Sequence, residues 1–326
     1  MRKKIIALVY GGDSSEVEIS VKSGKHMAKH IDRERYELYE VMISGKEWKV
    51  SIDDGITADI DKSDFSFVIP ALASEGRRVV FDKALIMIHG TPGENGLLQA
   101  YFEMVGIKFS SCSAVVSAIT FDKYACKCYI RDTGVKLPRE TFLRKGSDYS
   151  VREIVERLGL PLFVKPNNGG SSFGVTKVKK AEELGRAIEA AFEEDESILI
   201  EEFIEGREVT NGIYKYNGEL VQLPVTEIIP DNEFFDYDAK YLGASKEVCP
   251  ADIDSKMSDR ITGISQRLYE YLDCNGVVRF DYIIRGEDIY FLEVNTIPGM
   301  TEMSLVPQQI RAAGMTIKEF LNQLIG

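Results

Sequence analysis

The chain has 326 residues, of which 44% are hydrophobic and 28% charged, a balance typical of globular proteins with buried cores. The formal net charge is −12, from 40 basic and 52 acidic residues, which disfavours nucleic acid as a partner because its phosphate backbone is also negative. The sequence contains neither a long basic cluster nor an apolar run as long as a membrane span, so we expect neither a nucleic-acid nor a membrane partner.

The first expected element is a buried strand over residues 5–10, which runs into the glycine turn of "GGDSSEVEIS". Ser15 and Glu18 have the spacing of a capping box, and apolar or small residues then recur with helical spacing, so a helix is expected to begin here. Ligands of open α/β sheets bind where a strand ends and the next helix begins. Glu16 lies in this first turn, where it either complements the helix dipole or binds the ammonium group of a substrate. The segment alone favours the dipole.

Strands and helices continue to alternate, which indicates an α/β fold class. "ALIMIHG", residues 84–90, is typical of a buried strand, and "TPGENG" then leads to a helix from about residue 97. A strand-like "IKFSS" at 107–111 closes this unit. A new helix is expected from about residue 119 to Gly134, and the first domain boundary is placed there.

The stretch "KPNNGGSSFGV", Lys165 to Val175, is rich in glycine and serine, but its lysine precedes the glycines. It therefore differs from the P-loop pattern, in which the lysine follows them and a helix begins. Strand-like residues flank it on both sides, so we expect an antiparallel hairpin with the loop at its tip. Gly169, Gly170 and Gly174 would let the backbone approach a ligand closely. Taken alone, such a hairpin is more often a plain surface loop.

Two further strands are expected after a helix over 181–192. "ILIEEFI", 198–204, ends in two adjacent carboxylates, and "EVTNGIY", 208–214, follows it. Such a crossing offers backbone groups to a flat base and a carboxylate to the hydroxyl groups of a ribose.

The densest chemistry lies in "VVRFDYIIRGEDIYFLEVNTIPGM", which is typical of two strands joined by the turn "RGED". Arg279 and Asp281 share one face of the first strand, and Glu293 and Asn295 share one face of the second. If the hairpin pairs in register, Asp281 and Glu293 come together. Two carboxylates and an amide oxygen on one face suit Mg²⁺, because they are costly to bury without a counter-ion. The alternative is a solvent-exposed face, which the apolar neighbours disfavour.

Other patterns that could bind metal are weaker. Cys126 and Cys128 have one residue between them, not the two of a zinc or redox pair, and the five cysteines lack framework spacing. Reduced thiols indicate a cytoplasmic protein. His26 and His30 are four residues apart but lack the glutamate of H-E-x-x-H, so we interpret them as part of a solvated helix face.

Taken together, the lysine-led hairpin, the carboxylate pair and the magnesium face resemble the ATP-grasp superfamily. The closer resemblance is to D-alanine–D-alanine ligases, and it covers nearly the whole chain. The motifs that carry it, in order, are "GGDSSEVEIS", "HGTPGENG", "DK" at 122–123, "VKPNNGGSSFGV", "FDYDAKY" at 235–241, "VVRFDY" and "EVNTIPGMTEMSLVP". The last is the most specific. "HGTPGENG" departs from the family pattern at Thr-Pro and Asn, so no role is assigned to His89.

The resemblance implies a three-domain ATP-grasp architecture, α/β overall and α+β in its ATP-grasp part. An open α/β substrate domain would span 1–118, a central subdomain with the phosphate-covering hairpin 119–206, and a C-terminal subdomain with a lid loop and the magnesium site 207–326. The nucleotide would be held between the two β-rich parts. The implied reaction is ATP-dependent joining of two D-alanines through an acyl phosphate, for peptidoglycan precursors, by a homodimer.

The resemblance also assigns roles residue by residue. Residues implied in catalysis and substrate binding are Glu16, Ser171, Tyr241, Arg279, Gly299 and Ser304. Residues implied in nucleotide binding are Lys123, Lys165, Ser172, Glu201, Glu202, Phe203, Ile204, Glu208 and Lys240. Asp281, Glu293 and Asn295 would hold two Mg²⁺ or Mn²⁺ ions.

Two other functions remain open. One is another ATP-grasp carboxylate ligase, such as a D-alanine–D-lactate enzyme; Tyr241, within "DAKY", favours the peptide-forming branch. The other is a nucleotide-binding protein without catalysis, which the full set of implied phosphate and magnesium residues disfavours. Neither the D stereochemistry nor activation by monovalent cations follows from the residues alone.

Overall fold

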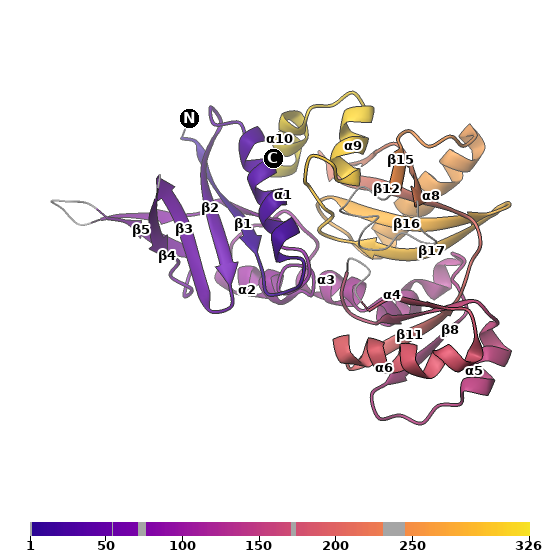
Figure 1. The fold of residues 1–326 in the computed structure, drawn as a ribbon. Coiled ribbons are helices and arrows are strands. Elements are labelled where there is room, and N and C mark those ends of the chain that lie inside the picture. Colours follow the sequence, from indigo (N-terminus) through magenta and orange to yellow (C-terminus); the bar gives the residue numbers. More distant parts are fainter. Residues whose placement is uncertain (1, 54, 71–75, 171–173, 231–244) are drawn as a thin grey trace.

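The computed structural model describes residues 2–53, 55–70, 76–170, 174–230 and 245–326. Figure 1 shows three sheet-containing regions that follow one another along the chain, from the N-terminal region in indigo and violet to the C-terminal one in orange and yellow. The two chain ends lie close together, and the Lys4 ammonium group hydrogen-bonds to the Gly326 carbonyl oxygen.

The N-terminal region is built on a five-stranded sheet with the order β4-β3-β2-β1-β7. β1 pairs in parallel with β2 and β7, whereas β2, β3 and β4 are antiparallel. A separate two-stranded sheet pairs β5 with β6. The strands are β1 (Lys4–Gly11), β2 (Tyr36–Ser44), β3 (Glu47–Asp53), β4 (Ile56–Asp59), β5 (Ser66–Ile69), β6 (Arg77–Val80) and β7 (Lys83–Ile86).

Strand β1 is covered on both faces, which explains its continuous apolar sequence. Leu8 belongs to a core shared with α1 (Val17–His30) and α10 (Ile317–Ile325). Val9 belongs to a core on the opposite face, with α2 (Leu97–Val105). The last helix of the chain therefore returns to the first sheet, as Figure 1 shows for α10 beside α1.

The helix expected over 119–134 is two helices in the structure, α3 (Ala114–Phe121) and α4 (Lys123–Ile130), followed by the 3-10 turn η1 (Arg131–Thr133). Asp122 causes the break. It has extended backbone, and its side chain accepts a hydrogen bond of 2.8 Å from the Ala125 N–H group, which caps the second helix.

The central region contains a four-stranded sheet with the order β10-β9-β11-β8. The predicted hairpin is confirmed, because Thr176 of β10 lies opposite Val164 of β9 in antiparallel register. Helices α5 and α6 share one core with the sheet. The elements are β8 (Glu140–Arg144), α5 (Val151–Leu158), β9 (Leu162–Pro166), β10 (Thr176–Val178), the 3-10 turn η2 (Ala181–Glu183), α6 (Leu184–Glu194) and β11 (Ser197–Glu202).

The C-terminal region carries a six-stranded antiparallel sheet in which β15-β14-β12-β16-β17 follow one another and β13 pairs with β12. Its core is shared with α8, and with residues of α3 and α4 from earlier in the chain. The elements are β12 (Arg207–Tyr216), β13 (Glu219–Gln222), β14 (Thr226–Pro230), β15 (Ser245–Val248), α8 (Ser255–Tyr271), β16 (Val278–Arg285), β17 (Asp288–Asn295) and α9 (Leu305–Ala312).

Local expectations differ from the structure at three further places. The predicted capping box is wrong, because Glu16 is the N-cap of α1 and no side chain caps it. β7 ends at Ile86, and residues 107–111 contribute only an isolated bridge at Phe109. The domain boundaries at 118/119 and 206/207 stay predictions; the three larger sheets fall on different sides of them, whereas α3, α4 and α10 pack across.

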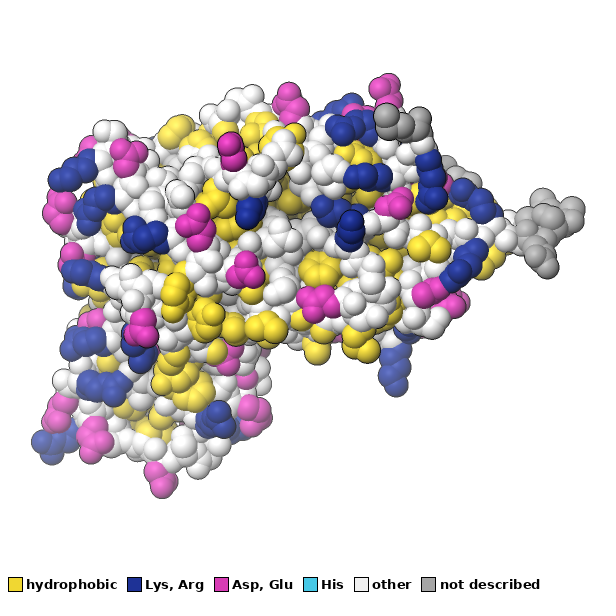
Figure 2. Space-filling view, turned by 180° about the vertical axis from the view of Figure 1, so that it is seen from behind, with side chains coloured by type: hydrophobic (Ala, Val, Ile, Leu, Met, Phe, Trp, Pro, Cys, Tyr) yellow, Lys and Arg dark blue, Asp and Glu magenta, His cyan; other side chains and the backbone are white. Residues whose placement is uncertain are grey.

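The charge distribution on the surface and the length of the helices bear on whether nucleic acid or a membrane could be a partner. On the face in Figure 2, acidic and basic side chains are interspersed and do not form one basic surface. No helix within the described part of the chain is long and apolar enough to cross a membrane.

Candidate active site

The hairpin of β16 and β17 places Asp281 directly opposite Glu293, and Arg279 opposite Asn295. A β-bulge is responsible. The turn that pairs Arg285 with Asp288 would, in an unbroken ladder, set Asp281 opposite Leu292. The register instead shifts between Asp281 and Tyr282, so that Leu292 is passed over. The bulge moves Glu293 from the core face to the face of Asp281, the kind of re-aiming for which bulges occur beside functional sites.

Asp281 is buried and accepts several hydrogen bonds. Arg279 donates through Nε at 2.9 Å and through its terminal nitrogen at 2.8 Å, Thr210 Oγ1 donates at 2.6 Å, and Asn295 Nδ2 donates at 3.0 Å. The carboxylates of Asp281 and Glu293 and the amide oxygen of Asn295 thus come from one sheet face. This set of hard oxygen donors fits Mg²⁺ or Mn²⁺.

Lys123 joins this face to the glycine-rich loop. Its ammonium group lies 4.0 Å from Oε2 of Glu293 and donates to the Gly169 carbonyl oxygen at 2.5 Å. Its backbone N–H donates to the carbonyl oxygen of Asn167 at 3.1 Å. Lys123 is the first residue of α4, so the helix break at Asp122 places it between Glu293 and the glycine-rich loop.

The glycine-rich loop also reaches Glu16. A Cβ atom added to Gly170 would lie 2.8 Å from Oε2 of Glu16, so a larger residue here would require the loop or the Glu16 carboxylate to shift. Glu16 is buried at the start of α1, and the backbone of Gly90 approaches it from another side. At the base of the loop, the Asn168 backbone and side-chain nitrogens donate to Oδ2 of Asp195 at 2.7 and 2.9 Å.

His89 and Glu94, to which the sequence assigned no role, lie beside Glu16. His89 is buried; its Nδ1 donates to the Ile297 carbonyl oxygen at 2.9 Å, so its Nε2 accepts from the Ser23 hydroxyl at 3.1 Å. Burial lowers the pKa of His89, which favours this neutral ring. Burial, and then the nearby Glu16 carboxylate, raise the pKa of Glu94 to about 8. Both residues belong to the motif "HGTPGENG", which is the sequence feature that could have indicated their place at the site.

The loop that follows β17 is held by α1. Ser23 Oγ accepts from the Met300 N–H group at 3.2 Å, and His26 Nδ1 donates to the Met300 carbonyl oxygen at 2.7 Å. The interpretation of His26 as part of a solvated face is therefore wrong, because it is partly buried against this loop. A Cβ atom on Gly299 would lie 2.9 Å from Ser304 Oγ, which itself accepts from the Thr301 N–H group at 3.0 Å.

The side chains at the end of β11 point to neighbouring cations. Glu201 is buried between Lys127 and Lys165, and its Oε2 lies 2.7 Å from the Lys165 ammonium group. Oε2 of Glu202 lies 2.8 Å from Nε and 2.7 Å from a terminal nitrogen of Arg139, and its Oε1 accepts from the Arg139 backbone N–H group at 2.8 Å. Both carboxylates already form ion pairs with protein side chains. We therefore expect any contact of Glu201 or Glu202 with an adenine to use backbone groups.

Three other residues expected at the nucleotide lie nearby. The Lys177 ammonium group is 4.0 Å from the centre of the Phe203 ring, and Ile204 is buried. Glu208 lies two residues before Thr210 on β12, and Thr210 is the register partner of Asp281. Glu208 therefore shares the face of the two opposed carboxylates. Ser171, Ser172, Lys240 and Tyr241 lie outside the described residues.

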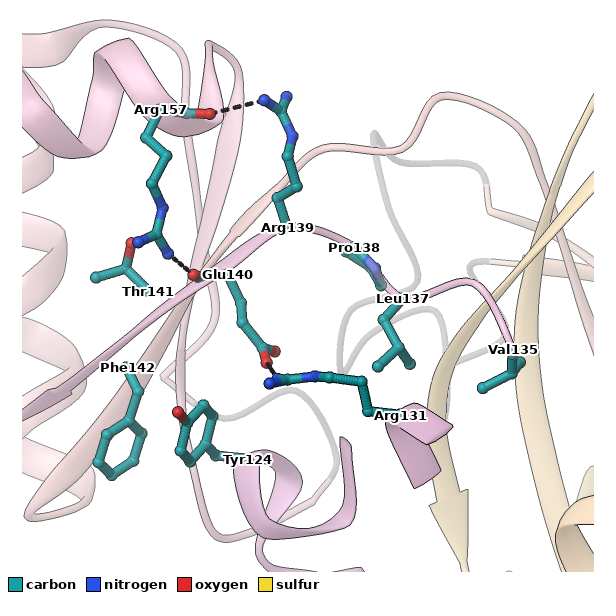
Figure 3. A pocket seen from close by; sticks show the side chains of 10 residues that line it. All are labelled: Tyr124, Arg131, Val135, Leu137, Pro138, Arg139, Glu140, Thr141, Phe142 and Arg157. Atoms are coloured by element: carbon teal, nitrogen blue, oxygen red, sulfur yellow. Dashed lines mark hydrogen bonds and ion pairs between the residues drawn. The ribbon is translucent and has the colours of Figure 1, made fainter. Parts of the chain in front are cut away.

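An open pocket lies at the edge strand β8, beside the hydrogen-bond network of Glu140 (Figure 3). The rings of Tyr124 and Phe142 stack along one side of it, with centroids 4.4 Å apart. Its arginines are bound to the protein; for example, Arg131 donates to Glu140 Oε1 at 3.3 Å. The residues that line it are Tyr124, Arg131, Val135, Leu137, Pro138, Arg139, Glu140, Thr141, Phe142 and Arg157.

Two family models match the sequence. One, "D-ala D-ala ligase N-terminus", matches residues 5–112, and the other, "D-ala D-ala ligase C-terminus", matches residues 132–326. The chain belongs to the D-alanine–D-alanine ligase family. The family predicted from the motifs is thereby confirmed.

Curated ligases of this family are similar over their whole length. D-alanine–D-alanine ligase of Phocaeicola vulgatus is 47% identical over 324 residues, with 99% of this chain and 98% of that protein covered. The ligase of Parabacteroides distasonis is 48% identical over 325 residues, covering 99% and 97%.

Solved structures of the family share the fold. A D-Ala:D-Ser ligase from Enterococcus faecalis has a TM-score of 0.88 at 31% identity and covers 100% of this chain and 99% of its own. D-alanyl-alanine synthetase A from Vibrio cholerae has a TM-score of 0.87 at 28% identity, with 100% of each chain covered. A Bacillus anthracis D-alanine–D-alanine ligase complexed with ATP has a TM-score of 0.77 at 29% identity and covers 99% and 95%. The predicted ATP-grasp fold is confirmed.

Proposed function

We propose that this chain is an ATP-dependent ligase that joins two D-alanine molecules into D-alanyl-D-alanine for peptidoglycan precursors, releasing ADP and phosphate. One observation carries the proposal: the glycine-rich loop contacts both the carboxylate face of β16 and β17, through Lys123, and the buried carboxylate of Glu16. Gly169 accepts from Lys123, which faces Glu293, while Gly170 lies against the carboxylate of Glu16. An anion that can hold an amino acid's ammonium group thus lies beside a site suited to phosphates.

The reaction takes two steps because a carboxylate is a poor electrophile. A carboxylate oxygen of the first D-alanine attacks the γ-phosphorus of ATP, and ADP leaves, giving an acyl phosphate. The amine of the second D-alanine, after losing a proton, attacks the acyl carbon. The tetrahedral intermediate then expels phosphate and leaves the peptide bond.

The substrate residues act through charge and hydrogen bonding. Glu16 holds the first D-alanine's ammonium group, and Ser304 binds the carboxylate of the second. Arg279 and the Gly299 N–H group stabilise the oxyanion of the tetrahedral intermediate. His89, Ser23 and His26 position the 297–300 segment that carries Gly299. Ser171 and Tyr241 are proposed, from the resemblance alone, to link loop closure to Glu16.

Asp281, Glu293 and Asn295 would hold two Mg²⁺ or Mn²⁺ ions, whose charge would offset that of the transferring phosphoryl group. Lys123 and Lys165 bind the α- and β-phosphates, and the resemblance alone implies that Ser172 and Lys240 contribute to nucleotide binding. Glu208 binds the ribose, and the 201–204 segment lines the adenine. Closure of the glycine-rich loop keeps water from the acyl phosphate.

The setting of the enzyme is proposed on less direct grounds. We propose three domains over 1–118, 119–206 and 207–326, a homodimer, and a cytoplasmic location, which five free cysteines support.

The test is phosphate release with product analysis by mass spectrometry. Purified protein, ATP and Mg²⁺ are given D-alanine, L-alanine, D-serine or D-lactate, each alone and each with D-alanine. We expect D-alanine alone to support turnover and to yield the dipeptide. A product formed only with D-serine or D-lactate as the second substrate would contradict the assignment, and phosphate release without any product would indicate an ATPase.

A further inference from the structure

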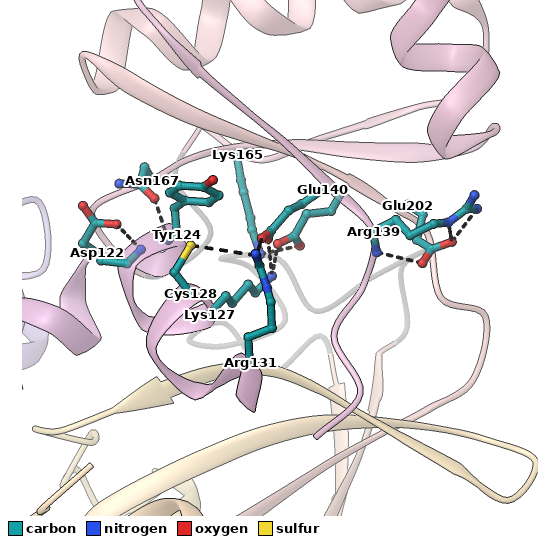
Figure 4. A network of polar contacts seen from close by, with 12 residues as sticks. Asp122, Tyr124, Lys127, Cys128, Arg131, Arg139, Glu140, Lys165, Asn167 and Glu202 are labelled. Carbon is teal, nitrogen blue, oxygen red and sulfur yellow. Dashed lines mark hydrogen bonds and ion pairs between the residues drawn. The ribbon is translucent and has the colours of Figure 1, made fainter. Parts of the chain in front are cut away.

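Lys127 is a charged residue that none of these roles uses. It lies on α4 and is fully buried. Its ammonium group hydrogen-bonds to Oε1 of Glu201 and lies 3.6 Å from Oε2 of Glu140. A buried ammonium group persists only where carboxylates compensate its charge. Figure 4 shows this network between α4 and the strands of the central sheet.

Glu201 is shared between two lysines. Its second oxygen, Oε2, lies 2.7 Å from the ammonium group of Lys165. Burial alone would raise the pKa of Glu201, but the two ammonium groups hold it at about 2. Burial opposes the charge on Lys165 as well, yet Glu201 raises the pKa of Lys165. Glu201 and Lys165 are therefore both charged, and the position of Lys165 depends on where Glu201 is held.

The balance of charge explains what Lys127 adds. Without it, Lys165 would face the carboxylates of Glu201, Glu293 and Glu140, with only Arg131 to offset the charge of Glu140. With Lys127 present, a second ammonium group shares Glu201 and lies 3.6 Å from Oε2 of Glu140. Lys165 then keeps enough positive potential to attract an anion on the face it shares with Phe163.

We propose that Lys127 is a positioning residue for nucleotide binding, which fixes and neutralises Glu201 so that Lys165 presents its ammonium group to the phosphates of ATP. The inference rests on the proposed role of Lys165 at the nucleotide. Lys127 does not touch the nucleotide; it acts through Glu201.

The first experiment compares two ligands in Lys127→Met, which keeps most of the length of the side chain and removes its charge. Calorimetry measures binding of ATP with Mg²⁺, and of adenosine, to the full chain. We expect ATP binding to weaken by about tenfold, whereas adenosine binding stays within a factor of about two. The KM for ATP rises in parallel, and kcat and the KM for D-alanine change little. Equal losses for ATP and adenosine, or unchanged ATP binding, would overturn the proposal.

A second variant separates positioning from folding. Lys127→Met combined with Glu140→Gln leaves one buried carboxylate paired with one ammonium group, so thermal stability should recover. ATP binding should stay weak, because Glu201 then neutralises Lys165. If the double variant regains full ATP affinity, Lys127 serves only to balance Glu140. This variant carries the test by itself if Lys127→Met does not fold.

Lys136→Met is the matched control. Lys136 pairs with Asp288 at 2.6 Å and is half-exposed, outside the Glu201 network. The Lys136→Met variant should bind ATP with the affinity of the unaltered chain. A wild-type chain that binds ATP but makes no dipeptide would contradict the proposed function and leave this comparison intact.

Discussion

Asp281 and Glu293 lie directly opposite each other in the β16–β17 hairpin because a β-bulge passes over Leu292. The bulge puts two carboxylates on one sheet face, where Arg279 and Asn295 donate to Asp281, and Lys123 lies 4.0 Å from Glu293. The site thus depends on one local irregularity in an otherwise regular ladder.

The first prediction concerns Glu293. Glu293→Gln keeps the shape of the side chain but removes the charge expected to bind metal. We expect kcat with D-alanine to fall by about three orders of magnitude, or about 4 kcal/mol of transition-state stabilisation, at an unchanged melting temperature. The rate of phosphate release at saturating Mg²⁺ measures kcat. Glu287→Gln, on the exposed turn of the same hairpin, should behave like wild type; near-normal turnover of Glu293→Gln would contradict the metal assignment.

The second prediction concerns the contact of the glycine-rich loop with Glu16. In Gly170→Ala the added Cβ atom would lie 2.8 Å from Oε2 of Glu16. The loop or the carboxylate must move, so we expect the KM for the first D-alanine to rise about tenfold, with ATP binding affected less. Gly185→Ala is the control, since its Cβ would meet nothing within 4 Å, and it should be neutral or slightly stabilising. Equal kinetics for both variants would show that the approach to Glu16 is not functional.

The third prediction concerns His26, which donates to the Met300 carbonyl oxygen at 2.7 Å. His26→Phe removes this donor and keeps a ring. Because Gly299 precedes Met300, we expect kcat to fall by roughly three- to tenfold through misplacement of the Gly299 N–H group, with the KM for ATP unchanged. His30→Phe, whose ring packs edge-on against His26, is the comparison. A loss confined to thermal stability would make His26 purely structural.

The fourth prediction concerns Glu94 and pH. Burial and the Glu16 carboxylate raise its pKa to about 8, above the roughly 4.3 of an unfolded glutamate. Between these values the folded chain binds the proton more tightly than the unfolded chain, so the contribution to the free energy of unfolding is fully present below about pH 4.3. It declines as the pH rises, by up to about 1.4 kcal/mol per unit, until about pH 8.

Glu94→Gln removes this titration. Urea unfolding of both chains from about pH 5 to 8 should show the variant gaining stability relative to wild type as the pH rises. Groups common to both chains cancel in the difference. Parallel curves would mean that Glu94 titrates normally.

The sequence by itself determined the family, the order of the elements and most of the local pairing. Period-2 patterning placed Arg279 with Asp281 and Glu293 with Asn295, because neighbouring side chains on a strand alternate between faces. The antiparallel hairpin around the glycine-rich loop followed in the same way from the strand-like residues on both sides. These features depend on contacts between residues close in the chain, so local patterns encode them.

Only the tertiary structure decided which distant residues meet. The bulge at Leu292 follows from the packing of Phe291 and Val294 in one core, and no turn rule required it. The return of α10 to α1, the hold of Ser23 and His26 on Met300, and the burial of Lys127 between Glu140 and Glu201 each join segments far apart in the chain. Their side chains carry no local signal of their partners, because burial and charge compensation arise only when the sheets and helices pack together.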